Sequence, residues 1–330
     1  MMAIDQALII FGPVPSRRLG CSLGINNIFP KFCSYSCVYC QVGRTSKWEV
    51  KPRTFYQPEV IQAAVVAQLE AAHRAGNTID YLTFVPDGEP TLDVHLGEAI
   101  DLLRPLGVKI AVISNSSLIW REDVRDILSK ADWVSLKVDA VDETIWKRIN
   151  RPYKILKLHE IMNGIRQFAK QFHGQLVSET MLIKGFNDSQ SSVAGVATFL
   201  REIGISNAYL SIPTRPTAEA DIQIPGELVM NLAYQMLASK LPQVEYLIDY
   251  EGDNFSFTDD VRLNLLSITA VHPMRESAVN ELLERSRENW SLVGELVAEG
   301  RLKEVDYLGK RYYVRCFPVR SNNNGSSGAD

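Results

Sequence analysis

Short hydrophobic runs and longer amphipathic segments alternate along the first two-thirds of the chain. The runs are rich in branched and aromatic residues, a pattern typical of buried strands. We expect strands over residues 22–28, 81–85, 109–114, 133–138, 176–183 and 208–212. Hydrophobic residues recur at helical spacing over residues 58–75, 92–103, 121–130, 156–172, 189–203 and 226–241.

The first of these helices shows how they are recognised. Pro58 suits the first helical position, and Ile61, Val65 and Leu69 recur on one face before Gly76, which suits the end of the helix. Six strand–helix units in succession predict parallel strands joined by right-handed crossovers. The pattern leaves open whether the sheet closes as a barrel, stops as a partial barrel or lies open.

The regular alternation of strand and helix patterns ends at about residue 242, and residues 246–250 look extended. Helical patterns then cover 259–271, 276–285 and 291–299, and strand-like runs cover 302–305 and 311–314. Three helices followed by a hairpin form the outline of a winged helix. We therefore expect an α/β domain over 1–244, a winged-helix-like module over 245–320 and a disordered, Asn/Ser/Gly-rich tail over 321–330.

Composition narrows the class of protein. The chain has 330 residues, with 46% hydrophobic and 22% charged residues, which is ordinary for a globular protein with a sizeable core. No run approaches the ~18 apolar residues of a membrane span, and no signal-peptide pattern opens the sequence, so we expect a cytoplasmic protein. The net charge of −4 argues against nucleic-acid binding over the whole surface but permits a local basic patch.

The cysteines carry the clearest chemistry. Three of the five, Cys33, Cys37 and Cys40, lie within eight residues, whereas Cys21 and Cys316 stand apart. Three thiolates on a short loop can bind three irons of a cubane cluster and leave the fourth iron open to a cofactor or substrate. A zinc site would need a fourth ligand, for which Cys21 is conceivable. The third alternative is that the cysteines are small buried hydrophobes.

The spacing C-x₃-C-x₂-C, with the aromatic Tyr39 before the last cysteine, resembles that of the radical S-adenosylmethionine (SAM) superfamily. The wider string over 12–20, 22–26 and 33–43 resembles a branch of stand-alone radical SAM proteins related to the tRNA wyosine-base synthases. The resemblance covers residues from about 11 to 215, and the C-terminal region more loosely.

This resemblance implies a partial (β/α)₆ barrel with a cluster loop at 29–43. Cys33, Cys37 and Cys40 would hold a [4Fe-4S] cluster, and SAM would bind the open iron. An electron from a donor such as ferredoxin or flavodoxin would cleave SAM to methionine and a 5′-deoxyadenosyl radical. That radical would take a hydrogen from a substrate inside a water-poor barrel.

Two polar segments follow strands in the positions that the superfamily uses for SAM. The first is Asp87-Gly88-Glu89-Pro90, which resembles a Gly-Gly-Glu-Pro segment that holds the SAM amino group, with Asp87 in place of the first glycine. Gly88 permits a close backbone approach, and Glu89 can accept from an ammonium group. The second is Ser114 and Asn115, which the resemblance assigns to the SAM ribose and carboxylate. A plain turn and a helix cap at Ser117 are the respective alternatives.

The expected fourth strand carries Ser135, Lys137 and Asp139 on one face and apolar residues on the other. The polar face would point into the barrel, where a cofactor supplies partners for the charges. The alternative is a Lys137–Asp139 ion pair at the rim. The resemblance also places around the ribose and adenine of SAM the residues Glu179, Met181 and Asn187, together with Tyr39 near the cluster.

Two basic regions lie outside the expected SAM site. Arg17 and Arg18 precede the first strand and either hold a substrate anion or face solvent. Residues 261–320 contain ten basic and eight acidic residues, and the basic ones crowd into the hairpin beside three tyrosines. That group is Arg301, Lys303, Lys310, Arg311, Arg315 and Arg320 with Tyr307, Tyr312 and Tyr313. The hairpin therefore contacts tRNA, binds a peptide, or packs as an appendage or dimer contact.

We interpret the chain as a radical SAM enzyme, with a tRNA base as one candidate substrate. The alternatives are an enzyme that modifies a peptide or installs a glycyl radical, and an iron–sulfur redox sensor that binds nucleic acid. Cys21 and Cys316 are too few for a second cluster of the kind that the wyosine-base synthases carry. A sensor would not need the residues that the SAM site requires.

Overall fold

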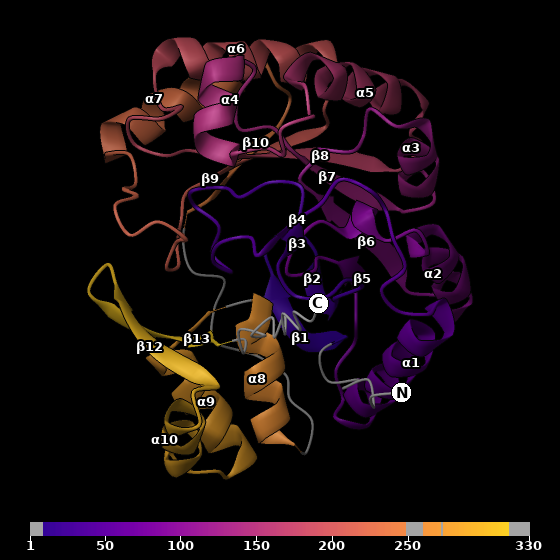
Figure 1. The fold of residues 1–330 in the computed structure, drawn as a ribbon, viewed down its shortest axis with the longest axis vertical. Coiled ribbons are helices and arrows are strands. Elements are labelled where there is room, and N and C mark those ends of the chain that lie inside the picture. The colour runs from indigo at the N-terminus through magenta and orange to yellow at the C-terminus, as the bar shows by residue number, and fades with distance from the viewer. Residues whose placement is uncertain (1–8, 249–259, 272, 317–330) are drawn as a thin grey trace, which may run out of the picture.

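The computed structural model describes residues 9–248, 260–271 and 273–316. Its main feature is an eight-stranded sheet in the order β1-β2-β5-β6-β7-β8-β9-β10, curled into a partial barrel (Figure 1). Only β1 and β2 are antiparallel, and all other neighbours in this sheet are parallel. The strands are β1 (Ile10–Ser16), β2 (Gly20–Ile25), β5 (Tyr81–Phe84), β6 (Lys109–Ser114), β7 (Trp133–Lys137), β8 (Gln175–Met181), β9 (Asn207–Ser211) and β10 (Val244–Leu247).

Helices cover the convex face of the sheet (Figure 1). They are α1 (Pro58–Arg74), α2 (Leu96–Leu103), α3 (Glu122–Leu128), α4 (Glu143–Asn150), α5 (Leu158–Gln171), α6 (Gln190–Glu202) and α7 (Glu227–Ala238), with short 3₁₀ turns at Pro90–Leu92 and Arg104–Leu106. The strand residues that face these helices, such as Leu82, Val112 and Leu136, belong to the largest buried cluster. The alternate residues face the lumen, where Trp133 and Tyr209 help form a separate small core.

The predicted partial barrel is confirmed, and each predicted strand and helix of its six units is present with boundaries within a few residues. The strand predicted over 22–28 begins at Gly20 and ends at Ile25. Within the sheet and its covering helices, β1 and α4 were not predicted. Strand β1 contains Pro13 and Pro15, which suit only an edge strand, and β1 lies at the edge of the sheet.

Helix α4 is the other unpredicted element. It has eight residues, too few for a clear helical period, and it begins where the Asp142 carboxylate accepts a hydrogen bond from the Ile145 amide at 2.9 Å. Arg151, with a φ of 44°, ends it in the left-handed conformation. The last residue of α4, Asn150, is thereby placed beside the cysteine loop.

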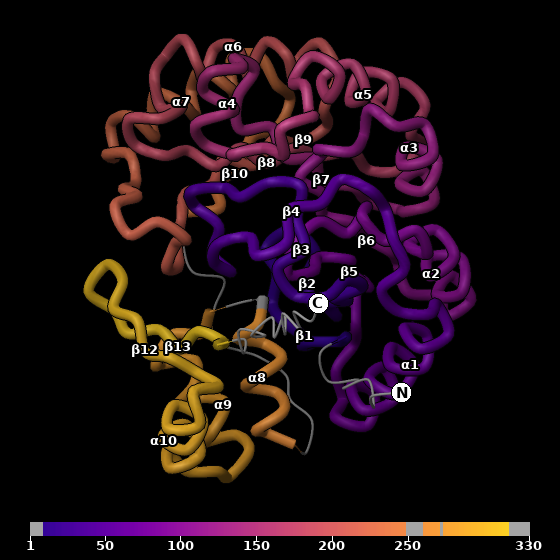
Figure 2. Tube along the Cα trace, viewed as in Figure 1, coloured from indigo at the N-terminus to yellow at the C-terminus, as the bar shows by residue number. Residues whose placement is uncertain are grey.

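The segment between β2 and α1 lies within the arc of the sheet (Figure 2). It holds a two-stranded parallel ladder of β3 (Phe32–Cys33) and β4 (Lys47–Trp48). Gly88, which follows β5, forms a parallel bridge with Phe32. A Cβ atom at position 88 would lie 1.8 Å from the Phe32 carbonyl oxygen, so this approach requires glycine.

The C-terminal residues form a second group of elements. The helices are α8 (Val261–Val271), α9 (Glu276–Ser286) and α10 (Ser291–Ala298), and a three-stranded sheet combines β11 (Met274–Arg275), β13 (Lys310–Arg315) and β12 (Leu302–Tyr307). Three helices and a hairpin were expected, and the short strand β11 was not. Most of the predicted extended stretch 246–250 is described, whereas residue 259 of the predicted helix, Arg320 and the tail 321–330 lie outside the described residues.

This C-terminal group has its own buried core, to which Val14 of β1 contributes. Tyr312 donates a hydrogen bond to the Thr214 carbonyl at 2.8 Å, and Tyr307 donates one to the Pro213 carbonyl at 3.2 Å. The group therefore contacts both the β1 edge and the segment that follows β9. Within the described part of the chain, no helix has the length and apolar character needed to cross a membrane.

Candidate SAM and iron–sulfur site

The carboxyl ends of the parallel strands meet at one rim of the barrel, where α/β folds place their sites. The cysteine loop lies at this rim. Cys33 is in β3 and Cys37 and Cys40 follow it, and all three thiols are free and partly accessible. Burial raises the pKa of all three, that of Cys37 to about 12. Three thiolates this close together and this poorly solvated would therefore be unfavourable without a cation or cluster to bind them.

Two asparagine side chains donate hydrogen bonds to the cysteines. Asn115 Nδ2 lies 3.4 Å from Cys33 Sγ, and Asn150 Nδ2 lies 3.4 Å from Cys37 Sγ. Such donors stabilise negative charge on a metal-bound sulfur. Asn115 was predicted as a SAM residue and here also braces the cysteine loop. Asn150 was not predicted, because it ends a helix that the sequence pattern did not reveal and it matches no motif.

The described residues contain no group of three His, Cys, Asp or Glu side chains close enough to hold one metal ion. A structural zinc ion would need such convergence, since its tetrahedral ligands all lie within about 2.3 Å of one atom. A cubane cluster has a different requirement, because each cysteine binds a separate iron. The arrangement of the three cysteines is compatible with that requirement.

Glu89 and Asp87 are two residues apart but have different surroundings. Glu89 accepts four hydrogen bonds, about as many as a carboxylate takes: from Thr91 N, Thr91 Oγ1, Ser114 Oγ and Asn115 N, at 2.6–3.1 Å. Glu89 thus ties the end of β6 to the turn after β5. Ser114 and Asn115 are brought together with it as predicted, and their donors serve Glu89.

Asp87 is fully buried and far less satisfied. Lys31 Nζ lies 3.2 Å from Oδ1, and Oδ2 accepts no hydrogen bond from the described residues. Burial raises the pKa of Asp87 to about 7, although Lys31 opposes the shift. The Asp87 carbonyl accepts from Lys31 N at 2.9 Å, so this carboxylate lies beside the cysteine loop. A buried oxygen without a partner marks a place for a donor group of a ligand.

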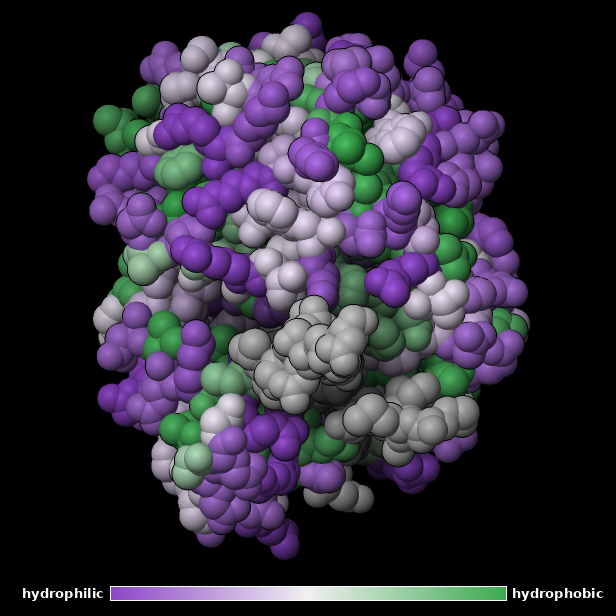
Figure 3. Space-filling model, viewed as in Figure 1, coloured by the Kyte–Doolittle hydropathy of each residue, from purple (hydrophilic) through white to green (hydrophobic). Residues whose placement is uncertain are grey.

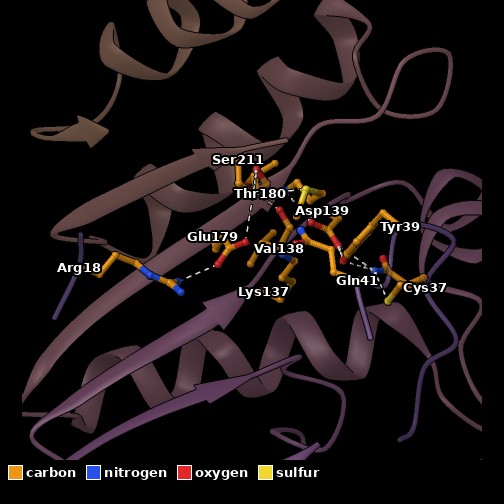
Figure 4. A network of polar contacts seen from close by, with 12 residues as sticks. Arg18, Cys37, Tyr39, Gln41, Lys137, Val138, Asp139, Glu179, Thr180 and Ser211 are labelled. Carbon is orange, nitrogen blue, oxygen red and sulfur yellow. Dashed lines mark hydrogen bonds and ion pairs between the residues drawn. The ribbon is translucent and has the colours of Figure 1, made fainter. Parts of the chain in front are cut away.

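A charged network crosses the lumen between β7 and β8 (Figure 4). Lys137 Nζ lies 2.7 Å from one Glu179 oxygen, and Arg18 Nη1 lies 2.7 Å from the other. Ser211 Oγ also donates to Glu179 at 3.0 Å. Burial alone would raise the pKa of Glu179, but Lys137 and Arg18 outweigh it and lower the pKa to about 2.

Asp139 has partners of its own, so the alternative Lys137–Asp139 ion pair is not formed. Its carboxylate accepts from the Tyr39 hydroxyl, from Asn150 Nδ2 at 2.7 Å and from Met181 N at 2.8 Å. Lys137 Nζ lies 5.1 Å from the centroid of the Tyr39 ring. Tyr39, Lys137 and Asp139 therefore link the last part of the cysteine loop to the lumen.

The remaining predicted residues are placed as follows. Ser135 is buried on the lumen face of β7. Asn187 donates to the Asp139 and Met181 carbonyls at 2.8 Å each and accepts from Ile183 N, so all its described contacts hold the chain after β8 in place. Pro90 begins a 3₁₀ turn after Glu89. Ser117 does not cap α3, which starts five residues later at Glu122.

The two arginines before β2 differ in their exposure and in their contacts. Arg17 is exposed. The Arg18 guanidinium lies 5.9 Å from the centroid of Trp133 and 5.7 Å from that of Tyr209, and it enters the lumen from the β1–β2 turn. Arg18, which was expected either to hold a substrate anion or to face solvent, thus pairs with Glu179, a partner that was not foreseen.

The fold and this rim define a radical SAM protein. The chain belongs to the radical SAM superfamily, whose family model matches residues 27–193. It is 44% identical over 317 residues to the UPF0026 protein MJ1312 of Methanocaldococcus jannaschii, which covers 96% of this chain and 98% of the relative. It is 36% identical to a UPF0026 protein of Helicobacter pylori strain 26695, over 73% of this chain and 79% of the relative.

Solved structures share the fold at low identity. A radical SAM methyltransferase from Sphaerobacter thermophilus matches with a TM-score of 0.54 at 19% identity, covering 68% of this chain and 66% of that one. TYW1 with a lysine–pyruvate adduct matches with a TM-score of 0.51 at 19% identity, over 67% and 74%. Streptococcus suis SuiB bound to its precursor peptide matches with a TM-score of 0.56 at 12% identity, over 83% and 66%.

Members of this superfamily use a [4Fe-4S] cluster and SAM. The residues present fit both groups. Cys33, Cys37 and Cys40 offer three thiols from one loop, Asp87 offers a buried oxygen without a hydrogen bond, and Gly88 allows the backbone to approach closely.

Proposed function

We propose that this protein is a radical SAM enzyme that acts on a substrate held in the barrel lumen. The observation that carries the proposal is the position of the three cysteine thiols at the same rim as the unsatisfied Asp87 carboxylate. When bound, the cluster and SAM would supply one-electron cleavage of SAM to methionine and a 5′-deoxyadenosyl radical that takes hydrogen from the substrate.

Different residues of the chain would contact or position different parts of SAM. Asp87 would accept from the SAM ammonium group, because its Oδ2 is buried and lacks a donor. Glu89 would position the backbone of Gly88 and Pro90 through its bonds to Thr91, Ser114 and Asn115. The other predicted SAM residues would line the path from the cluster into the lumen; they are Tyr39, Ser135, Lys137, Asp139, Glu179, Met181 and Asn187.

The lumen would also orient the substrate and exclude water. Arg18 and the rings of Trp133 and Tyr209 lie together at its end nearest the β1–β2 turn, and both rings are buried. Lys137 and Glu179 hold each other in place as an ion pair, and they would present fixed charges to polar groups of the substrate. The substrate would lie between these charges and the cysteine loop.

A tRNA base remains the first hypothesis for the substrate, supported by the sequence string around the cysteines. The C-terminal hairpin supports RNA binding less than its composition suggested. Tyr312 and Tyr313 are buried, so their rings are not open for base stacking. Arg311 lies 3.7–4.0 Å from Glu276, Glu304 and Asp306, which neutralise it. The main alternative is an enzyme that modifies a peptide or installs a glycyl radical in a protein. The other alternative, a redox-sensing regulator, would leave the SAM residues without a role.

Anaerobic reconstitution tests this proposal. The protein loaded with iron and sulfide should convert SAM to 5′-deoxyadenosine in the presence of dithionite. Cys33→Ala, Cys37→Ala and Cys40→Ala should each abolish that product, and Cys21→Ala should not. Substrate deuterium should appear in 5′-deoxyadenosine only in the pool, tRNA or peptide, that contains the substrate. SAM cleavage that survives the three cysteine replacements would refute the proposal.

A further inference from the structure

One side of the cysteine loop carries exposed aromatic and basic residues. Phe29 is 43% exposed and Trp48 is 50% exposed, the latter among the most exposed large hydrophobic residues described. Lys47, Lys51 and Arg53 are near Trp48 in sequence and are also exposed, and Phe29 and Arg53 both contact the rings of Phe32 and Phe55. We call the five exposed residues the cluster-side patch. On the face of the molecule shown in Figure 3 most side chains are hydrophilic, and hydrophobic ones are scattered among them.

The patch is connected directly to a cluster ligand. Trp48 pairs with Cys33 in the β3–β4 ladder, and Glu49 N donates to the Cys33 carbonyl at 3.1 Å. Lys47 N donates to the Lys31 carbonyl at 3.1 Å in the same ladder. The exposed indole is therefore one backbone pairing away from a residue that holds iron.

The charge of the patch is left available to a partner. Among the described residues, Lys47, Lys51 and Arg53 form no ion pair within 4.0 Å. The Glu49 carboxylate accepts from the amides of Lys51 and Val50 at 3.0 and 2.9 Å, and these bonds together with the charges of Arg53 and Lys51 lower its pKa. Glu49 therefore stays ionised, and residues 47–53, with three basic residues and one acidic residue, carry a net charge of +2. Lys47 and Lys51 thus face solvent, and the exposed Arg53 has its guanidinium 5.5 Å from the ring centroid of Phe32 and 6.0 Å from that of Phe55, on a chain whose net charge is −4.

We propose that the cluster-side patch docks an acidic one-electron carrier protein that reduces the cluster. The inference rests on the proposed function, since superfamily members need an electron donor. One electron passes from the reduced carrier to the cluster, the carrier is oxidised by one electron for each SAM cleaved, and no atom or proton is exchanged at this surface. Acidic residues of the carrier would meet the three cations, and its apolar rim would meet Trp48 and Phe29.

An electron carrier fits the patch better than RNA does. Weak redox encounters bury less than about 1,200 Å² in total, so a patch of this size suffices. An RNA that delivers a base to the lumen would have to reach the side of the site where Lys137 and Glu179 lie, and it would meet a chain that is acidic elsewhere. Basic residues with an exposed indole nevertheless also suit RNA, so RNA binding is an outcome of the test.

The test compares two reductants. Lys47→Glu combined with Lys51→Glu should reduce the initial rate of SAM cleavage driven by reduced flavodoxin by about tenfold or more at low salt, and should remove most of its salt dependence. The rate driven by dithionite, which needs no docking surface, should not change. Lys109→Glu with Lys170→Glu makes the same change of charge on exposed lysines of β6 and α5, away from the cysteine loop, and should leave both rates unchanged.

A binding measurement keeps the two proposals separable. Flavin anisotropy of oxidised flavodoxin should report weaker binding to the Lys47/Lys51 variant than to the wild type, even if no SAM is cleaved. Unchanged binding and an unchanged flavodoxin-driven rate would overturn the docking proposal while dithionite-driven cleavage upheld the proposed function. Loss of tRNA retention on filters, with carrier binding intact, would assign the patch to RNA and equally overturn the proposal.

Discussion

Asp87 and Glu89 show that two carboxylates of one turn can have separate tasks. Glu89 accepts four hydrogen bonds and joins β5 to β6, whereas Asp87 keeps one buried oxygen without a donor. The sequence identified both as polar residues after a strand. It could not show which one is satisfied, because their partners come from Lys31, Thr91 and the end of β6 rather than from the motif.

We expect Asp87→Asn to weaken SAM binding by about ten- to a hundredfold, since one charge-assisted hydrogen bond is worth roughly 1.5–3 kcal/mol. Equilibrium dialysis of the reconstituted protein with labelled SAM would measure this, and the iron content should stay the same. Asp93→Asn is the matched control, because Asp93 is an equally buried carboxylate whose partners are Asn27 and the His95 amide. Equal SAM affinity in wild type and Asp87→Asn would contradict the assignment.

Asp87 should also make the metal-free protein less stable as the pH rises. Its folded-state pKa of about 7 lies above the ordinary value, so the folded chain retains a proton that the unfolded chain loses above about pH 4. The free energy of unfolding should therefore decrease between about pH 4 and pH 7, by up to roughly 4 kcal/mol from this residue. Asp87→Asn should flatten that slope in urea unfolding of metal-free protein, and an identical slope in both proteins would show that Asp87 does not titrate in this range.

At the scale of elements, periodicity predicted the six strand–helix units because each strand has one face toward the helices. It missed β1, because its prolines are unusual in a strand and suit only an edge strand. It also missed α4, which is too short to show a helical period. It placed Lys137, the last residue of β7, and Asp139, two residues beyond it, on one face, with cofactor groups as their partners and a Lys137–Asp139 ion pair as the alternative. The observed Lys137–Glu179 pair comes from the parallel register of β7 and β8, where these two residues are direct partners, and a single sequence does not contain that register.

Helix α4 places Asn150 beside Cys37, and its effect on the reduction potential of the proposed cluster can be measured in an Asn150 variant. The Asn150 amide donates to Cys37 Sγ and to Asp139, so Asn150→Ala removes a hydrogen bond that would stabilise the reduced, more negative state of the proposed cluster. A loss of about 1 kcal/mol of such stabilisation corresponds to a reduction potential about 40 mV more negative. Redox titration followed by electron paramagnetic resonance would detect this shift. Asn163→Ala, on the exposed face of α5, should leave the potential unchanged, and an unchanged potential in Asn150→Ala would show that α4 has no influence on the cluster.

At the scale of the whole molecule, the C-terminal elements are joined to the barrel at two separated places. Val14 of β1 packs into their core, and Tyr307 and Tyr312 donate to the segment after β9. Since β1 and β10 are the two edges of the curled sheet, and β9 is the neighbour of β10, these contacts lie on both sides of its open flank (Figure 1). We infer that the C-terminal group acts as a wall of the partial barrel, which explains why Tyr312 is buried.

Tyr312→Phe tests whether the wall supports the barrel. The hydroxyl of Tyr312 donates to the Thr214 carbonyl and accepts from Arg275 Nε at 2.9 Å in a buried position, so its removal leaves both groups without this partner. We expect the free energy of unfolding to fall by about 1–3 kcal/mol and amide exchange to accelerate around residue 214. Tyr307→Phe removes a longer bond from a half-buried ring and should cost less than about 1 kcal/mol. If the C-terminal group were only a tethered recruiting module, Tyr312→Phe would leave exchange in the barrel at its wild-type rate, because a tether transmits no packing energy to the segment after β9.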